Sequence, residues 1–297
     1  MSGQFALGWI PDYPDFRDYT EETREVRQIL KGTGLPPGRT GKKMRISKTP
    51  PTSVDLREWC SPVEDQGGLG SCTAQAGVGI IEYYERKSFS RHIDASRLFL
   101  YKVTRNLMKM RGDTGAYLRS TIGAMVLFGV PPEEYWPYTD RPDGFDQEPP
   151  AFCYSFAQNY KALKYYRHDP PSASPEDLLD RVKTYLSAGH PAMFGFTVYS
   201  SIEQASGTGR IPFPSPLDKI EGGHAVVAVG YDDTMKTKNK YGGPEAEGAL
   251  LIRNSWGQGW GEGGYGWLPY DYLRKGLAED FWSVLKKEWV DTGEFRI

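Results

Sequence analysis

The hydrophobic pattern of this 297-residue chain changes near residue 190. Before that point apolar side chains recur at helical spacing, as Ala74, Val78 and Ile81 do. After it, short apolar or aromatic runs are separated by Gly, Pro and Asp, as strands are by turns. The runs are AMFGFTV, HAVVAVGY, ALLIRNSW and GYGWLPY. The pattern predicts an α+β chain in which a helical half precedes a sheet half.

Three helices are expected in the main part of the chain. Residues 73–87 are crowded with small apolar side chains and predict a buried central helix. A second helix is expected over residues 117–130, ending at Gly129 before two prolines. A third is expected over residues 174–189, with Ser174 as its N-cap and Gly189 as its stop. The polar, turn-rich segment 232–248 between two strands is expected to be a solvated hairpin loop.

The first 52 residues differ in composition from the rest. They are rich in Pro and Gly and contain one short amphipathic stretch, residues 21–31, that is long enough for a few helical turns. We therefore expect an N-terminal arm over residues 1–52 and one globular domain over residues 53–297. Within the domain, the helical half is expected over about 53–160 and the sheet half over about 161–297.

Charge and cysteine content exclude several classes of function. Lys and Arg total 36 against 38 Asp and Glu, so the net charge of -2 provides no attraction to nucleic acid or to a membrane surface. The sequence shows no signal-peptide pattern and no apolar run that could cross a bilayer. Its three cysteines include no pair at metal-ligand spacing, so neither zinc nor a disulfide framework is expected. We expect a cytoplasmic protein that needs no metal or other cofactor.

Cys72 has the local setting of a reactive thiol. It follows Gln66-Gly67-Gly68-Leu69-Gly70-Ser71 and begins the expected central helix. Unpaired backbone N–H groups and the helix dipole favour a thiolate at such a position. A buried, unreactive cysteine is the commoner role of a lone thiol and remains the alternative for Cys72 taken alone.

Two further residues complete a possible catalytic set. His224 follows Gly222-Gly223 and opens a predicted strand, beside small residues that leave room for a ligand. Asn254 follows the strand ALLI, and its amide oxygen is suited to fix the tautomer of an imidazole. Trp256 would shield that hydrogen bond from water. Taken singly, His224 could equally be a structural histidine and Asn254 a turn residue.

Together these motifs resemble those of the papain-like cysteine peptidases. Gln66 precedes Cys72 by six residues, as in that family, and His224 is followed by Ala225-Val226. Residues 254–257 read Asn-Ser-Trp-Gly, and the similarity extends into Gly259-Trp260-Gly261-Glu262. The resemblance covers most of the chain from about Val54 onward and is closest to the bacterial and archaeal branch. It implies a two-lobed fold with a helical lobe, an antiparallel barrel-like sheet lobe and the active site in the cleft between them.

The resemblance also implies roles for individual residues. Cys72 would attack a peptide bond, His224 would carry the proton, Asn254 would orient His224, and Gln66 would supply an oxyanion-hole donor. Substrate backbone would bind near Thr114 and Gly115, with Gly222, Gly223 and Trp256 lining the site. Peptides or proteins are the expected substrates.

The chain departs from the family at several points. Thr73 stands where an aromatic residue is usual, Leu69 stands in place of a disulfide-forming cysteine, and the long inhibitory prodomain of secreted members has no counterpart. We expect residues 1 to about 40 to fold back across the cleft, because a Pro-rich arm is partly pre-ordered. A disordered tail is the alternative. For the whole chain, the alternatives are a thiol amidase or acyl transferase that acts on a non-standard peptide, and an inactive peptide-binding module.

Overall fold

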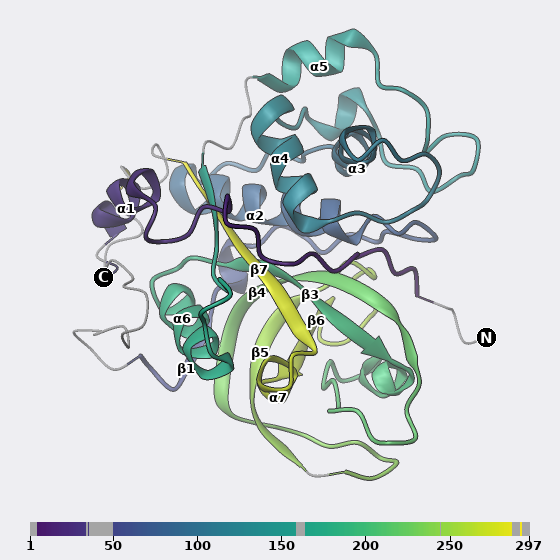
Figure 1. Ribbon diagram of the computed structural model, residues 1–297. Helices are drawn as coiled ribbons and strands as arrows, with labels where there is room; N and C mark the ends of the chain where they lie inside the picture. The colour runs from purple at the N-terminus through teal and green to yellow at the C-terminus, as the bar shows by residue number, and fades with distance from the viewer. Residues whose placement is uncertain are drawn as a thin grey trace.

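A computed structural model describes residues 5–33, 35, 50–158, 164–243, 245–286 and 292. It has two parts, helices in one and an antiparallel sheet in the other (Figure 1). The remaining residues of the arm, 1–4, 34 and 36–49, lie outside the described residues. The helices of the first part are α2 (Cys72–Phe89), α3 (Arg97–Leu107), α4 (Leu118–Phe128), α5 (Ala151–Ala157) and the 3-10 helix η3 (Glu133–Tyr135).

The second part is a seven-stranded sheet in the order β2-β7-β3-β4-β5-β6, with β1 paired to β4. Helices α6 (Pro175–Ser187) and α7 (Asp271–Arg274) and the 3-10 helix η5 (Ser200–Ala205) accompany it, and η2 (Arg57–Trp59) follows β1. The strands are β1 (Ser53–Asp55), β2 (Lys164–Arg167), β3 (Ala192–Tyr199), β4 (Ile220–Thr237), β5 (Ala246–Arg253), β6 (Tyr265–Pro269) and β7 (Ala278–Leu285).

The central helix is confirmed and holds the two parts together. Residues 72 to 84 of α2 are all buried, and the helix packs on α3, α4 and β4. Small residues make this contact possible, since a Cβ at Gly77 would lie 2.9 Å from the Met125 sulfur. The first turn of α2 therefore has a fixed position relative to β4.

The other two expected helices are also confirmed. Helix α4 ends before Gly129, which has a positive φ of 79°. Helix α6 begins at Ser174, whose side chain accepts a hydrogen bond from the Asp177 N–H, and it is followed by Gly189 with φ 81°. Helix α3 and the short α5 were not expected from the pattern.

Three expectations for the sheet half need correction. Segment 232–248 is not a loop throughout, because β4 and β5 continue into it and pair Lys236 with Glu247 and Thr237 with Ala246. The sheet is open rather than barrel-like: among the described strands, β2 and β6 stand at opposite ends of the order. Residues 53–55, assigned above to the helical half, form β1 on the sheet.

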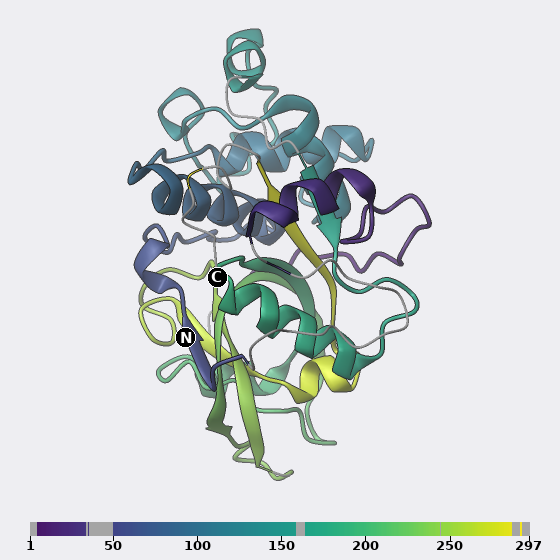
Figure 2. The ribbon, with the colours of Figure 1, turned by 90° about the vertical axis from the view of Figure 1, so that its left-hand side faces the viewer.

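The arm crosses the junction of the two parts. Its first described residues run between the helices and the sheet, and the chain then turns into α1 (Arg24–Leu30) and the 3-10 helix η1 (Lys31–Thr33) (Figure 1). Figure 2 shows α1 at the level of that junction, where it contacts β2. Val26 and Leu30 of α1 are buried, which confirms the amphipathic stretch as a packed helix. Within the described residues, no helix has the length and apolarity to cross a bilayer.

Candidate active site

Cys72 lies at the N-terminus of α2 and is fully buried. Burial raises the pKa of its thiol to about 11, and the backbone N–H groups of Ala225 and Gly8 offset only part of that rise. The sequence favoured a thiolate at this helix terminus, but desolvation outweighs the dipole in this conformation. Cys72 is therefore a protonated thiol here. One of its neighbours is Ala225, the residue that follows His224.

His224 and Asn254 form the hydrogen bond that their spacing suggested. His224 lies on β4 opposite Phe196, and its Nε2 is 2.8 Å from the Asn254 Oδ1 at the end of β5. Burial lowers the pKa of His224 to about 4, and the Asn254 contact opposes this shift. The ring is neutral, so Nε2–H donates and Nδ1 carries the lone pair. Nδ1 has no hydrogen-bond partner among the described residues.

The Trp256 ring lies between the His224 ring and the Phe5 ring of the arm. Its ring stacks on His224 with centroids 4.4 Å apart and an interplanar angle of 25°. Phe5 stacks against it at 4.1 Å and 13°. The resulting three-ring stack excludes water from the His224–Asn254 hydrogen bond.

Gln66 is held in one orientation by a residue that the sequence analysis did not single out. Its Oε1 accepts a hydrogen bond from the Ser255 Oγ at 2.5 Å. Its Nε2 donates to the Leu69 carbonyl at 2.7 Å and to the Ala6 carbonyl of the arm at 3.1 Å. Ser255 lies between Asn254 and Trp256 in the sequence, and that position was the only signal that could have marked it.

Residues 5–10, here called the inner arm, pair with both parts of the molecule through backbone atoms. The N–H groups of Gly8 and Trp9 lie 3.1 and 3.0 Å from the Gly223 carbonyl oxygen. On the other side, Ala116 N–H donates to the Gly8 carbonyl at 2.8 Å, and Ile10 N–H donates to the Ala116 carbonyl at 3.1 Å. The inner arm is thus bonded to the β4 side and to the segment before α4.

Glycines make room for the inner arm. A Cβ on Gly8 would lie 1.9 Å from the Gly70 carbonyl oxygen, and one on Gly115 would lie 2.3 Å from the Gly8 oxygen. Gly222 contacts Leu7 and Gly223 contacts Trp9, each at a distance that forbids or crowds a side chain. Of the five residues expected to bind substrate, Gly115, Gly222, Gly223 and Trp256 contact the arm. Thr114 is exposed, and its hydroxyl donates to the Gly115 carbonyl.

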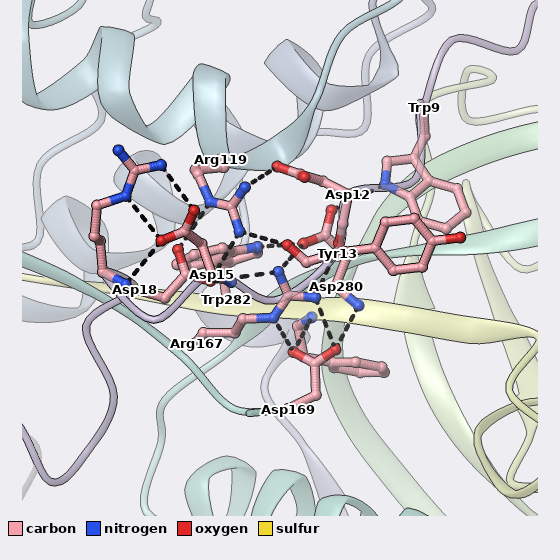
Figure 3. Close-up of polar contacts among 12 residues, drawn as sticks. Trp9, Asp12, Tyr13, Asp15, Asp18, Arg119, Arg167, Asp169, Asp280 and Trp282 are labelled. Carbon is pink, nitrogen blue, oxygen red and sulfur yellow. Dashed lines mark hydrogen bonds and ion pairs between the residues drawn. The ribbon is translucent and has the colours of Figure 1, made fainter. Parts of the chain in front are cut away.

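Residues 12–18, here called the outer arm, are held by ion pairs instead. Arg119 of α4 pairs with Asp12 and, at 2.8 Å, with Asp18, and it donates to the Tyr13 carbonyl at 2.8 Å (Figure 3). Arg167 of β2 donates to the Asp12 carbonyl at 3.2 Å. These partners are distant in sequence, and nothing in the local motifs marked them.

An open pocket of about 690 Å³ adjoins the inner arm. Phe5, Ala6 and Leu7 form part of its wall, and residues of both parts form the rest, among them Gly70 and Val198. The carboxyl groups of Asp113, Glu203 and Glu221 also border it. The pocket shows that space remains beside the arm at the junction of the two parts.

The other histidines and cysteines lie elsewhere. His168 and His190 are buried and bonded to Ser283 and Tyr84, whereas His92 is exposed. Cys60 and Cys153 are buried free thiols. Over the described ranges, no cluster of three or more His, Cys, Asp or Glu side chains is arranged to hold a metal ion.

The family model for papain family cysteine proteases matches residues 50–281 of the chain. The chain belongs to this family. The match covers all four residues of the candidate site, and it makes the protein a cysteine-type peptidase whose substrates are peptides or proteins. The two-lobed α+β fold expected from the motifs is confirmed, with the sheet open.

Individual relatives agree with this assignment. The chain is 35% identical over 226 residues to an uncharacterized peptidase C1-like protein of Acanthamoeba polyphaga mimivirus, covering 74% of this chain and 68% of the relative. It is 31% identical over 230 residues to the cathepsin B-like CP3 of Giardia intestinalis, covering 72% and 68%.

A solved structure is similar over nearly the whole chain. Xylellain, a cysteine protease from Xylella fastidiosa, is 35% identical, has a TM-score of 0.73, and matches 95% of this chain and 96% of its own. This similarity supports the bacterial branch that the motifs suggested. Digestive procathepsin L 3 of Tenebrio molitor, 20% identical with a TM-score of 0.61 over 94% of this chain and 84% of its own, shares the fold.

Proposed function

We propose that this papain-family peptidase cleaves peptide bonds with Cys72 as nucleophile, His224 as proton carrier and Asn254 as the group that orients the histidine. The observation that carries the proposal is the 2.8 Å contact between His224 Nε2 and Asn254 Oδ1. It leaves Nδ1 as the ring nitrogen that takes a proton from the thiol. The Cys72 thiolate then attacks the carbonyl carbon and forms a thioester, the protonated His224 gives its proton to the leaving amine, and water hydrolyses the thioester.

Gln66 is proposed as a donor to the oxyanion. Its Nε2 already donates to a backbone carbonyl, that of Ala6, at 3.1 Å. The Ser255 hydroxyl fixes which end of the amide faces this position. A preorganised donor of this kind contributes about 3–4 kcal/mol to transition-state stabilisation in other hydrolases.

We further propose that the inner arm inhibits the enzyme in its own cleft. The group that the arm places beside the Cys72 sulfur is the Gly8 N–H, which is not an electrophile, so the arm can occupy the site without being attacked. The arm also uses the Gly223 carbonyl and the Gln66 amide, two groups that a substrate would need. With the arm in place, the thiol and the imidazole are desolvated and neutral.

Deleting residues 1–50 would be a poor test of inhibition by the arm, because it would also remove Val26 and Leu30 of α1, which are buried in the core. A sharper test inserts the recognition sequence of a site-specific protease in the outer arm, beside Phe16, which is 96% exposed. After folding and cutting, the inner arm loses its covalent link and its high effective concentration, and we expect it to dissociate. Hydrolysis of fluorogenic peptides should then rise at least tenfold over the same chain left uncut.

The two proposals are separated by variants in the cut chain. Cys72→Ala should abolish hydrolysis, whereas Cys60→Ala, a matched change at another buried thiol, should retain it. Loss of the arm fragment by mass spectrometry with no gain in hydrolysis would contradict inhibition by the arm. Equal activity of Cys72→Ala and the parent would contradict the catalytic assignment.

A further inference from the structure

The peptide group between Leu69 and Gly70 is hydrogen-bonded on both sides. The Leu69 carbonyl oxygen accepts from Gln66 Nε2 at 2.7 Å. The Gly70 N–H of the same group donates to Asp113, at 3.0 Å to Oδ1 and at 3.1 Å to Oδ2. Because the C=O and the N–H of a trans peptide point in opposite directions, Gln66 and Asp113 lie on opposite sides of the group. Rotation of this peptide group would break the contacts on both sides.

The loop that contains this peptide group has little stiffness of its own. Residues 66–71 include three glycines, and Gly67 has a positive φ of 57°. Glycine leaves the backbone free to adopt several conformations, so contacts with other segments must select one of them. The loop joins Gln66 to Cys72, the first residue of α2. Its conformation therefore determines where the Gln66 amide lies relative to the Cys72 thiol.

Three carboxylates accept hydrogen bonds from the backbone of this loop. Asp65 accepts from the Gly67 N–H at 2.9 Å, and Asp140 accepts from the Gly68 N–H at 3.0 Å. Of the three, Asp113 is the one that accepts from the peptide group to which the Gln66 side chain donates. Asp113 therefore acts on the orientation of the Gln66 amide most directly.

Asp113 is itself held in place by a tyrosine. Tyr101 of α3 is fully buried, and its hydroxyl donates to Asp113 Oδ1 at 2.5 Å. The same hydroxyl accepts from the Gly115 N–H at 3.1 Å. The Arg105 guanidinium lies over the Tyr101 ring, 4.1 Å from its centroid. The carboxylate thus has a fixed position between α3, the segment before α4 and the loop.

A carboxylate at the N–H end of a peptide group also strengthens hydrogen bonding at the C=O end. Hydrogen bonds that share one peptide group polarise one another, so the charge of Asp113 makes the Leu69 oxygen a better acceptor. One N–H of Gln66 Nε2 is held by this oxygen, and Oε1 is held by the Ser255 hydroxyl at 2.5 Å. The other N–H donates to Ala6 of the arm at 3.1 Å and becomes available to an oxyanion when the arm leaves.

We propose that Asp113 is a positioning residue of the peptidase, which holds the Leu69–Gly70 peptide group so that Gln66 presents one N–H to the oxyanion. This rests on the proposed catalytic roles of Cys72 and Gln66. The contact with the oxyanion is made in the transition state and not with the bound substrate, so loss of Asp113 should lower kcat much more than it changes KM. A small misplacement of a catalytic group can cost about a hundredfold in rate.

The test is a double-mutant cycle in the cut chain described above, with an uncharged, alanine-rich fluorogenic amide as substrate. Asp113→Ala should lower kcat roughly tenfold to a hundredfold and change KM by less than about threefold. Gln66→Ala should lower kcat roughly a hundredfold to a thousandfold. In the Gln66→Ala background, Asp113→Ala should lower kcat by less than about twofold, because the group that it positions is absent. Equal losses of kcat in the two backgrounds would overturn the proposal.

Three further variants separate positioning from a general loss of structure. Asp113→Asn keeps an acceptor for the Gly70 N–H and should retain more kcat than Asp113→Ala. Tyr101→Phe removes the hydroxyl that donates to Asp113 but leaves the Gly70 contact, so its loss of kcat should be the smaller one. Asp143→Ala, the same change at an exposed carboxyl that pairs with Arg141, should leave kcat unchanged.

The outcomes distinguish this proposal from the proposed activity. A loss of kcat in Tyr101→Phe as large as that in Asp113→Ala would overturn the proposal, because the contact with Gly70 would then not be the one that matters. A change confined to KM in Asp113→Ala would overturn it as well. Parental activity in Gln66→Ala would instead contradict the proposed role of Gln66 in catalysis, and with it any role of Asp113 that acts through Gln66.

Discussion

The two stretches of the arm are attached in different ways. The inner arm is held by backbone hydrogen bonds, by glycines that admit no side chain and by buried rings. The outer arm is held by ion pairs to Arg119, while Tyr13 and Phe16 are 88% and 96% exposed. Close packing is insensitive to salt, whereas ion pairs at the surface weaken with it. The inner arm therefore determines whether the site is blocked, and the outer arm determines how readily the block is lifted.

The largest expected difference between the uncut chain and the cut chain is the reactivity of Cys72. With the arm in place the thiol pKa is about 11, so below that value only a small fraction is thiolate. The alkylation rate of the intact protein should rise about tenfold per pH unit between pH 7 and 10. The cut chain should react roughly a hundredfold faster at pH 7, because an imidazolium partner lowers a thiol pKa. A fast, pH-independent rate in the intact chain, measured with iodoacetamide, would show that the arm does not desolvate the thiol.

The next largest effect should come from Gly8→Val, which breaks the inner arm alone. A side chain there would collide with the Gly70 carbonyl, whose oxygen lies 1.9 Å from the added Cβ. The inner arm should leave, and the uncut variant should approach the activity of the cut chain, at least tenfold above the uncut parent. Phe16→Ala, which changes an exposed residue of the same arm, is the control and should have no effect. An inactive, folded Gly8→Val protein would show that the inner arm does not inhibit.

Arg119→Gln tests the outer arm and should have a smaller effect. It removes the ion pairs with Asp12 and Asp18 while leaving the inner arm unchanged. We expect activity of the uncut chain to rise a few-fold at low salt, because a partly exposed ion pair contributes roughly 1 kcal/mol or less. The parent should gain activity as NaCl is added and the variant should not. Arg17→Gln, which disrupts only the exposed pair with Asp15 within the arm, serves as the control.

Phe5→Ala should have the smallest effect. The stack of Phe5 on Trp256 is worth about 0.5–1.5 kcal/mol beyond its buried area. Because Phe5 is only half-buried, we expect the lower end of this range, a rise of about twofold in the activity of the uncut chain with no change in its salt dependence. If this rise in activity disappeared at high salt, the contributions of the inner arm and the outer arm to inhibition would not be independent of each other.

Much of the catalytic geometry could be predicted from the sequence, because helix-capping residues and short motifs indicate it locally. The capping residue Ser174 and the stops Gly129 and Gly189 marked three helix termini, the start and end of α6 and the end of α4. The positions of Gln66, Cys72, His224 and Asn254 followed from short motifs, each contained in a few consecutive residues. The same motifs assigned Gly115, Gly222 and Gly223 to substrate binding, and in this structure the three glycines contact the arm.

What the sequence did not reveal depends on contacts between distant residues. Strand β7 carries Glu279 and Asp280 in an apolar run, and only its pairing with β2 and β3 makes that segment a strand. The hairpin of β4 and β5 is extended by pairing across polar residues, which hydrophobic periodicity cannot detect. The arm is Pro-rich along its whole length, and its composition cannot distinguish residues bonded to Gly223 from a tail.

The backbone hydrogen bond from Gly8 to Gly223 and the side-chain hydrogen bond from Trp9 to Asp280 also bear on biosynthesis. Residues 5–10 are synthesised before β4 and β7, the strands that carry these two partners. The arm therefore lacks these two partners until β7 has emerged. Docking of the arm is a late step of maturation, and a nascent chain that stalls before β7 has no place for Trp9 to bind.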